Sequence, residues 1–353
     1  MFSKHLLKLY RTSEPYHDRT KYIRLDKNER IKPFSKKIIN DFKKISFSEI
    51  LQTYPISKKL IKEIAKKEKI NEKYINIIPG SDGGLKYIFE LFAGEKRRAM
   101  GSIFPTYGMI EIYAKIYKYN FHKINFNENL NNNIKKLLKK VSFIYIANPN
   151  QPSGKYIKKS EILNIIRLAK KKNIFVVVDE AYIDFSGFKS ISIFAKKFNN
   201  LIVLKTFSKS YGLAGLRIGY LLANEKFNKI FNSIRPSYDV SHFSIKIAEY
   251  FLKNEKIKKS YIKQVESSKK YLIKECKKRN LGFIDTKTNF FYIKVPNKQI
   301  KKMYKFMFAN KVLIRTSFRE DFKKLDNSIR ITVGDISMMN FFFKLFDKVY
   351  KKR

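Results

Sequence analysis

The stretch Thr206-Phe-Ser-Lys-Ser-Tyr-Gly-Leu-Ala-Gly-Leu-Arg-Ile-Gly-Tyr220 constrains the fold of this chain more than any other. It follows the apolar run 201–204, which predicts a buried parallel strand. Its small residues and glycines allow the backbone to approach a ligand closely. Lys209 therefore lies at the exit of a buried strand, where solvation alone explains a lysine poorly. Alone, Lys209 would be interpreted as a surface residue of a lysine-rich chain.

Two upstream strands end in equally unusual residues. Asn148 directly follows the apolar run 143–147, and Asp179 follows the β-branched run 174–178. Helical patterns separate the strands, and this alternation predicts a parallel sheet with right-handed crossovers. Ligands of open α/β sheets bind at the carboxyl ends of the strands. We therefore expect Asn148, Asp179 and Lys209 to meet at one edge and form a ligand site.

The 353 residues suffice for a large α/β domain and a smaller one. We expect an N-terminal arm over residues 1–40, a large domain over 41–240, and a small α+β domain over 241–353. The predicted fold class is α/β, with a mostly parallel sheet flanked by helices in the large domain. Ser160 is the predicted N-cap of the helix that follows the strand 143–147.

A glycine-rich turn, Pro79-Gly-Ser-Asp-Gly-Gly84, precedes the helical pattern 85–92. Free N–H groups at the positive end of a helix dipole are suited to anchor a phosphate. The predicted anchors are Ser81, Asp82 and Gly83. In isolation, such a turn is as often a simple helix cap as an anion site.

The composition excludes several classes of protein. No apolar stretch reaches the roughly 18 to 20 residues that cross a bilayer, so we expect no membrane segment. One cysteine, Cys276, and four scattered histidines exclude an internal disulfide and indicate no metal site, so a reducing cytoplasm is the expected location. The net charge of +46 would suit nucleic acid, but lysines are spread along the whole chain and no DNA-binding motif accompanies them. We expect no specific nucleic-acid partner, and a field that attracts small anions.

Eight segments together carry a resemblance to a known family: Asn28-Glu29, Tyr54-Pro55, Gly80-Ser-Asp82, Pro105-Thr-Tyr107, Asn148-Pro-Asn-Gln-Pro-Ser-Gly154, Asp179-Glu-Ala-Tyr182, the segment around Lys209, and Arg330-Ile-Thr-Val-Gly334. In this order they resemble the histidinol-phosphate aminotransferase branch of the fold-type I pyridoxal-phosphate enzymes. The resemblance spans nearly the whole chain. It implies pyridoxal 5'-phosphate as cofactor, transfer of an amino group from a small phosphorylated or otherwise anionic amine to a 2-oxo acid, and a homodimer.

The resemblance also implies roles for particular residues. Lys209 would supply the amine that holds the cofactor and later moves the substrate's α-proton, while Asp179 would keep the pyridine nitrogen protonated. Tyr182 and an amide from Asn148 or Gln151 would reach the phenolic oxygen, and Tyr107 would stack on the ring. The phosphate would be bound by the following residues, the last from the partner subunit: Ser81, Asp82, Gly83, Ser208, Arg217 and Tyr54. The substrate would contact Asn28, Arg315 and Arg330.

The chain departs from the family pattern at three places. Gln151 replaces the usual asparagine before Pro152, Gly83 stands where an acidic residue commonly follows Asp82, and the arm reads Asp26-Lys-Asn-Glu-Arg30. The departures in the arm and substrate loop leave the identity of the amino donor open. They do not affect the residues expected to carry the core chemistry.

Three other functions remain to be compared with the aminotransferase. A decarboxylase of a phosphorylated amino acid, such as O-phosphothreonine or O-phosphoserine, would use the same residues. A DNA-binding regulator built on this fold would need a reading head, and the residues before the first motif are too few for one. A catalytically inactive scaffold is disfavoured because Lys209, Asp179, Tyr182 and Arg217 are all present.

Overall fold

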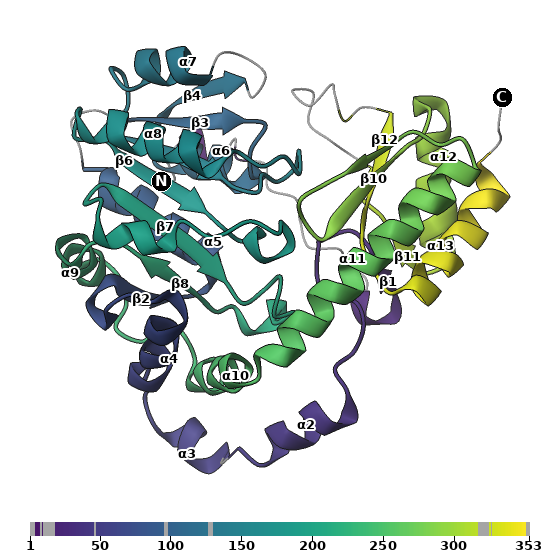
Figure 1. The fold of residues 1–353 in the computed structure, drawn as a ribbon, viewed down its shortest axis with the longest axis horizontal. Coiled ribbons are helices and arrows are strands. Elements are labelled where there is room, and N and C mark those ends of the chain that lie inside the picture. Colours follow the sequence, from purple (N-terminus) through teal and green to yellow (C-terminus); the bar gives the residue numbers. More distant parts are fainter. Residues whose placement is uncertain are drawn as a thin grey trace.

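The computed structural model describes residues 4–7, 9, 18–45, 47–94, 98–125, 130–316, 325 and 327–350. Its largest element is a seven-stranded sheet with the strand order β2-β8-β7-β6-β5-β3-β4 (Figure 1). The strands are β2 (Ile75–Ile78), β3 (Ala99–Phe104), β4 (Asn120–Asn125), β5 (Phe143–Ala147), β6 (Phe175–Asp179), β7 (Leu201–Thr206) and β8 (Gly219–Leu222). The central pairings are parallel, and β8 runs antiparallel to both of its neighbours. The predicted parallel sheet is confirmed, and β5, β6 and β7 lie side by side.

Helices cover both faces of this sheet, which explains why its central strands are apolar on both sides. One face packs on α4 (Lys58–Glu68), α7 (Leu130–Leu137), α8 (Lys159–Lys170) and α10 (His242–Lys253). The other face packs on α5 (Gly80–Phe92), α6 (Gly108–Ile116) and α9 (Glu225–Ser233). Alternate residues of β5 follow this division, because Ile144 and Ile146 face the first group and Phe143 and Tyr145 the second.

A smaller α+β part lies beside the sheet, and the N-terminal arm packs with it (Figure 1). Its antiparallel sheet has the order β12-β10-β9, and β1 of the arm pairs in parallel with β11. The strands are β1 (Ile23–Arg24), β9 (Phe283–Asp285), β10 (Phe290–Lys294), β11 (Val312–Leu313) and β12 (Ser328–Thr332). The helices are α11 (Glu255–Lys278), α12 (Asn297–Ala309) and α13 (Ile336–Val349). The other α-helices of the described residues are α1 (Lys4–Leu7), α2 (Lys36–Lys43) and α3 (Phe47–Gln52).

The division of the chain at residue 240 stays a prediction. The buried side chains of α10, including Ile245 and Phe251, pack with the seven-stranded sheet. Helix α11 then crosses to the smaller part, where Tyr261 and Leu272 join the second core (Figure 1). The core therefore changes within α11. None of the helices in the described ranges combines the length and apolar character needed to cross a bilayer.

Two local predictions were wrong. Helix α8 begins at Lys159 with Lys158 as N-cap, whose N–H donates to Glu161 Oε2 at 3.1 Å, so Ser160 lies inside the helix. The glycine-rich turn after β2 is itself the first turn of α5, which begins at Gly80 instead of near residue 85. Both errors arise because a helix terminus depends on backbone geometry that residue type alone does not fix.

Candidate active site

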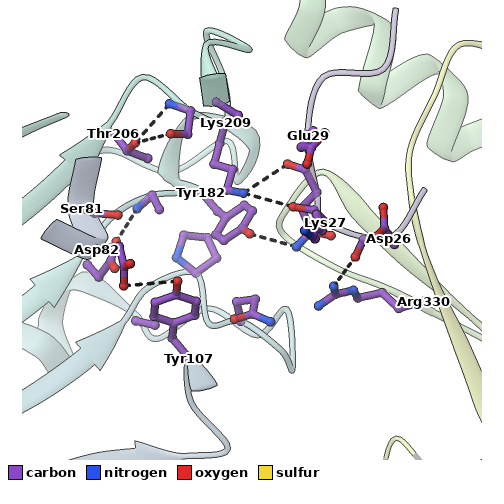
Figure 2. Close-up of a pocket in the computed structure, with 18 of the residues that line it drawn as sticks. Asp26, Lys27, Glu29, Ser81, Asp82, Tyr107, Tyr182, Thr206, Lys209 and Arg330 are labelled. Carbon is purple, nitrogen blue, oxygen red and sulfur yellow. Dashed lines mark hydrogen bonds between the residues drawn. The ribbon is translucent and has the colours of Figure 1, made fainter. Parts of the chain in front are cut away.

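A cavity of about 410 Å³ lies where the carboxyl ends of β5, β6 and β7 meet the start of α5, the arm and the smaller sheet (Figure 2). Most of the predicted site residues line it: Asn28, Ser81, Asp82, Tyr107, Gln151, Asp179, Tyr182, Ser208, Lys209, Arg217, Arg315 and Arg330. Three of the predicted residues, Tyr54, Gly83 and Asn148, do not line it. Within the described residues, no group of three or more His, Cys, Asp or Glu side chains could hold a metal ion.

The Lys209 side chain points into this cavity toward the arm (Figure 2). Its amine donates to the carbonyl oxygens of Lys27 at 3.4 Å and Asn28 at 3.3 Å, and lies 5.6 Å from the centroid of the Tyr182 ring. Figure 2 shows Lys27 on the arm side of the cavity, opposite Lys209. The amine of Lys209 thus lines the space between the two sheets, and its role toward a ligand stays a prediction.

Asp179 is buried at the end of β6. Its carboxylate accepts hydrogen bonds from the Ala181 N–H at 2.9 Å and from the Tyr145 hydroxyl at 3.0 Å. Burial raises the pKa of Asp179 to about 6, because the two donors only partly offset burial and the Asp82 and Glu180 charges add to it. A cationic ring N–H beside this carboxylate would lower the pKa of Asp179 again and favour its ionised form.

Small polar groups and one guanidinium gather at another wall of the cavity. Arg217 has left-handed backbone, φ 48°, and its Nη1 donates to Ser208 Oγ at 3.4 Å. Gly80, φ 72°, opens α5 beneath it, and a Cβ there would lie 3.0 Å from Arg217 Nη2. Ser81 and Thr206 also line this wall. With the first N–H groups of α5, these residues form a suitable cradle for a phosphate.

Gly83 stands one turn further along α5 and has a packing role. A Cβ built at this position would lie 2.5 Å from Pro79 Cγ, so the glycine is explained by contact with the preceding proline. Its side of the helix does not line the cavity.

The two tyrosines and Gln151 shape the space between these walls. Tyr107 Oη donates to Asp82 Oδ1 at 3.4 Å, and burial and then the Asp82 charge raise the pKa of Tyr107 well above 10. Tyr182 Oη accepts from Asn28 Nδ2 at 2.9 Å. Gln151 Oε1 is buried without a hydrogen-bond partner among the described residues, which leaves it available to a ligand.

Asn148 does not line the cavity, contrary to the prediction. Its Nδ2 donates to Ile157 O at 3.1 Å, and its Oδ1 accepts from Ile157 N at 2.8 Å. Both ends of the amide therefore pin the loop that follows β5. The strand end delivers the residue to the correct edge, but tertiary hydrogen bonds decide where its side chain points.

The smaller sheet contributes two guanidinium groups. Arg315 and Arg330 bond to each other through their backbones at 3.0 and 2.8 Å. Arg330 Nη2 donates to Asp26 O at 2.7 Å, while its buried Nε has no partner in the described part of the chain. Burial and the neighbouring Arg330 charge lower the pKa of Arg315. This concentration of positive charge is suited to an anionic ligand group.

Tyr54 lies outside the cavity of its own chain. The side chain is 73% exposed and stacks on Tyr238, with ring centroids 4.4 Å apart. The sequence also missed residues that do line the cavity, chiefly Tyr145, Thr206, Asp26, Lys27 and Glu29. Alternation along β5 would have found Tyr145, which shares a strand face with Ala147.

Comparisons with known proteins agree with this geometry. The family model described as aminotransferase class I and II matches residues 21–342. The chain belongs to this family. It is 30% identical over 321 residues to the histidinol-phosphate aminotransferase of Clostridium beijerinckii, covering 89% of this chain and 87% of that protein.

Two solved structures share the fold. The histidinol-phosphate aminotransferase of Sinorhizobium meliloti, in complex with pyridoxal-5'-phosphate, has a TM-score of 0.85 at 18% identity, covering 99% of this chain and 97% of that one. The L-threonine-O-3-phosphate decarboxylase of Porphyromonas gingivalis has a TM-score of 0.79 at 20% identity, covering 92% and 98%. At these identities the likeness concerns the fold alone. Because the chain belongs to this family and is similar to the curated relative, it is an aminotransferase that depends on pyridoxal 5'-phosphate.

The residues of the cavity fit that cofactor. An amine, a buried carboxylate, an anion cradle that a Cβ at Gly80 would fill, and the orphaned Gln151 Oε1 lie around one space. When bound, pyridoxal phosphate supplies an electron sink for the bonds of the substrate's α-carbon.

Proposed function

We propose that the aminotransferase takes its amino group from a small phosphorylated or otherwise anionic amine, of the histidinol-phosphate kind, and passes it to a 2-oxo acid. The observation that carries this proposal is one cavity lined by Lys209, Asp179, Arg217, Arg315 and Arg330. It holds an anion cradle on α5 and a second cationic region on the smaller sheet. The first suits the cofactor phosphate and the second an anionic end of the substrate.

Each side chain has a proposed task within this site. Asp179 holds the pyridine nitrogen in its protonated form, Tyr107 stacks on the ring, and Tyr182 and Gln151 contact the phenolic oxygen. Lys209 Nζ acts as the general base that takes the proton from the substrate's α-carbon. It then acts as the general acid that gives the proton back as the amino group is transferred. The phosphate is held by the backbone N–H groups of Ser81 and Asp82 in the first turn of α5, by the Ser208 hydroxyl and by Arg217.

Donor specificity tests the substrate assignment. Histidinol phosphate, histidinol, O-phosphoserine and O-phosphothreonine would each be incubated with the holoenzyme, with and without 2-oxoglutarate. We expect glutamate formation, with phosphorylated donors preferred. Arg315→Gln should raise KM for phosphorylated donors by about 10- to 100-fold, since a charge-assisted hydrogen bond is lost, and should change KM for histidinol far less. Release of amine and CO₂ from a phosphoamino acid without an acceptor would instead establish a decarboxylase.

Lys209→Ala tests the chemistry independently of the donor. Loss of the amine should lower turnover at least about a thousandfold and remove the absorbance of the lysine-linked cofactor. Lys66→Ala, at a lysine on the solvent side of α4 whose side chain is 75% exposed, is the matched control and should leave both unchanged. Retained turnover in Lys209→Ala would exclude this lysine from the reaction.

We also propose a homodimer in the cytoplasm, in which Tyr54 reaches the cofactor phosphate of the partner. Tyr54 is exposed in the single chain, and exposed apolar side chains lie near it in sequence or in contact: Leu51, Ile56 and Tyr238. Such a set of exposed apolar residues is typical of a surface that becomes buried in an assembly.

A further inference from the structure

Tyr145 is a fully buried tyrosine in the middle of β5, and its hydroxyl reaches the cofactor cavity. In the parallel register, Tyr145 pairs with Val177 and Ala147 pairs with Asp179. Asp179 therefore lies two residues beyond Val177, the strand partner of Tyr145. The Tyr145 ring extends toward Asp179, and its Oη donates to Asp179 Oδ2 at 3.0 Å. The ring lies in the hydrophobic core beneath α5, which fixes its position.

The surroundings of Asp179 make this hydrogen bond consequential. In the described ranges, no Lys, Arg or His side chain lies within ion-pair distance of the carboxylate. Its donors are the Ala181 N–H and the Tyr145 hydroxyl, while Asp82 and Glu180 oppose its charge. Of the two donors, only the hydroxyl is a side chain that evolution or mutagenesis can remove.

The Tyr145 hydroxyl is a dependable donor. Burial, followed by the Asp179 charge, raises the pKa of Tyr145 well above 10, so the phenol keeps its proton across the working pH range. Its single O–H has a single acceptor, Asp179 Oδ2. An ionised carboxylate gains more from such a bond than a protonated one.

We infer that Tyr145 is a positioning residue of the cofactor site, which holds Asp179 ionised and turned toward the pyridine nitrogen. The inference rests on the proposed role of Asp179 and adds a residue to it. It predicts how tightly pyridoxal phosphate is retained, and in what manner retention depends on pH. It requires no knowledge of the amino donor, so it can be tested separately from the substrate assignment.

The direction of the pH effect follows from the chemistry. Tyr145→Phe keeps the ring and removes one of the two donors, so Asp179 should be protonated at higher pH than in the wild type. A neutral acid holds a pyridinium less well than a carboxylate does. The loss of retention should therefore be largest in mild acid, where the variant's acid is protonated and the wild type's is partly ionised, and smaller in mild alkali.

The experiment is equilibrium dialysis of the holoenzymes at about pH 6 and about pH 9, with bound pyridoxal phosphate measured by absorbance. Because Tyr145→Phe removes a hydrogen bond to a charged group, the variant should retain the cofactor about 10- to 100-fold less tightly than the wild type at the lower pH. At the higher pH, the difference in retention between the variant and the wild type should be clearly smaller. Tyr119→Phe is the matched control: Tyr119 lies in the same core and donates to Phe89 O at 3.0 Å, away from Asp179. It should bind the cofactor as the wild type does.

A second background isolates the contact. Asp179→Asn alone tests the proposed role of Asp179, and in that background Tyr145→Phe should have little further effect. An equal loss with and without Asp179, or a loss that is the same at both pH values, would overturn the inference. If the phenylalanine perturbs β5, a ring-fluorinated tyrosine at position 145 keeps the shape and strengthens the donor. It should retain the cofactor at least as tightly, and weaker retention would also overturn the inference.

Discussion

Asp179 is a buried carboxylate at which burial and hydrogen bonding shift the pKa in opposite directions. Its folded pKa of about 6 lies above the ordinary 3.8, since burial outweighs the Ala181 and Tyr145 hydrogen bonds. In the cofactor-free protein the folded state binds the extra proton between these two values. The free energy of unfolding therefore falls as pH rises through this window, and it stays reduced above it.

Asp179→Asn should remove this pH-dependent penalty. The stability of the variant relative to wild type, both freed of cofactor, should increase by up to about 3 kcal/mol as pH rises from about 4 to about 8. Urea denaturation across this range measures the difference. A difference that does not vary with pH would mean that Asp179 ionises normally in the folded protein. Pyridoxal phosphate should stabilise the wild type more than the variant at neutral pH, because only the wild type offers it a carboxylate.

At the scale of elements, the arm and the Lys209 segment form a single contact. Asn28, φ 58°, donates its backbone N–H to Thr332 Oγ1 and accepts at its carbonyl from Lys209 and Asn289. The Arg30 side chain lies against Gly212, three residues after the lysine. The smaller sheet thus reaches the lysine through the arm.

Gly212→Ala tests this contact against a matched glycine. Gly212 and Gly187 both have φ 75°, but a Cβ at Gly212 would lie 2.4 Å from Arg30 Cδ, while one at Gly187 meets nothing within 4 Å. The two alanines share the backbone strain of about 1 kcal/mol, and only Gly212→Ala displaces the arm. We expect at least about a tenfold loss of kcat/KM for Gly212→Ala and a small stability loss with normal kinetics for Gly187→Ala. Equal kinetics for the two variants would show that the arm contact does not matter.

A buried ion cluster supports the sheet behind the active site. Lys205 of β7 contacts Glu68 of α4 at 3.1 Å and Glu180 at 3.6 Å, and Tyr220 Oη donates to Glu68 at 2.7 Å. Burial alone would lower the pKa of Lys205, but the Glu68 and Glu180 charges raise it instead. The lysine is thus charged, and its removal would leave two buried carboxylates without their cation.

Lys205→Met should cost about 3–5 kcal/mol of folding free energy, the usual effect of breaking a buried ion pair. Lys226→Met, at an exposed position on α9, should change stability by less than about 0.5 kcal/mol. The midpoints of urea denaturation of the two variants give the comparison. A small effect at Lys205 would mean that Glu68 and Glu180 take up protons when the lysine is lost, and stability would then fall more steeply above neutral pH.

At the scale of the whole molecule, the cavity lies between the large sheet and the smaller part. The large sheet supplies Lys209, Asp179 and the start of α5, and the smaller part supplies Arg315 and Arg330 with the arm. One proposed contributor, Tyr54, faces away from the cavity of its own chain. A complete site therefore requires a second copy if the proposed dimer is correct.

Mixed dimers test this proposal. Lys209→Ala and Tyr54→Ala homodimers should both be weakly active, the first without its amine and the second without its partner's phosphate contact. In a mixed dimer, one site has Lys209 from one subunit and Tyr54 from the other. Co-refolding the two variants should therefore restore activity to up to about a quarter of the wild-type value, since half of random dimers are mixed and each has one intact site. No recovery would exclude a shared site.

The sequence by itself determined the fold class, the parallel order of the three strands that end at the cavity and most of the residues that line it. Apolar runs that end in Asp179 and Lys209 fix which edge of the sheet they occupy, because the carboxyl ends of parallel strands share one edge. The glycine-rich turn 79–84 similarly indicated the proposed anion cradle at the start of α5. These features depend on the order of apolar, polar and glycine residues within short segments, and this order can be read directly from the sequence.

The tertiary structure alone decided which way side chains point at those strand ends. Asn148 satisfies the backbone of Ile157 and does not line the cavity, whereas Tyr145, whose strand face follows from the alternation of β5, donates its hydroxyl to Asp179. The arm approaches Lys209 only because Asn28 bonds to β12, more than 300 residues away in the chain. Such contacts depend on the distance between segments after folding, and residue type and spacing do not encode that distance.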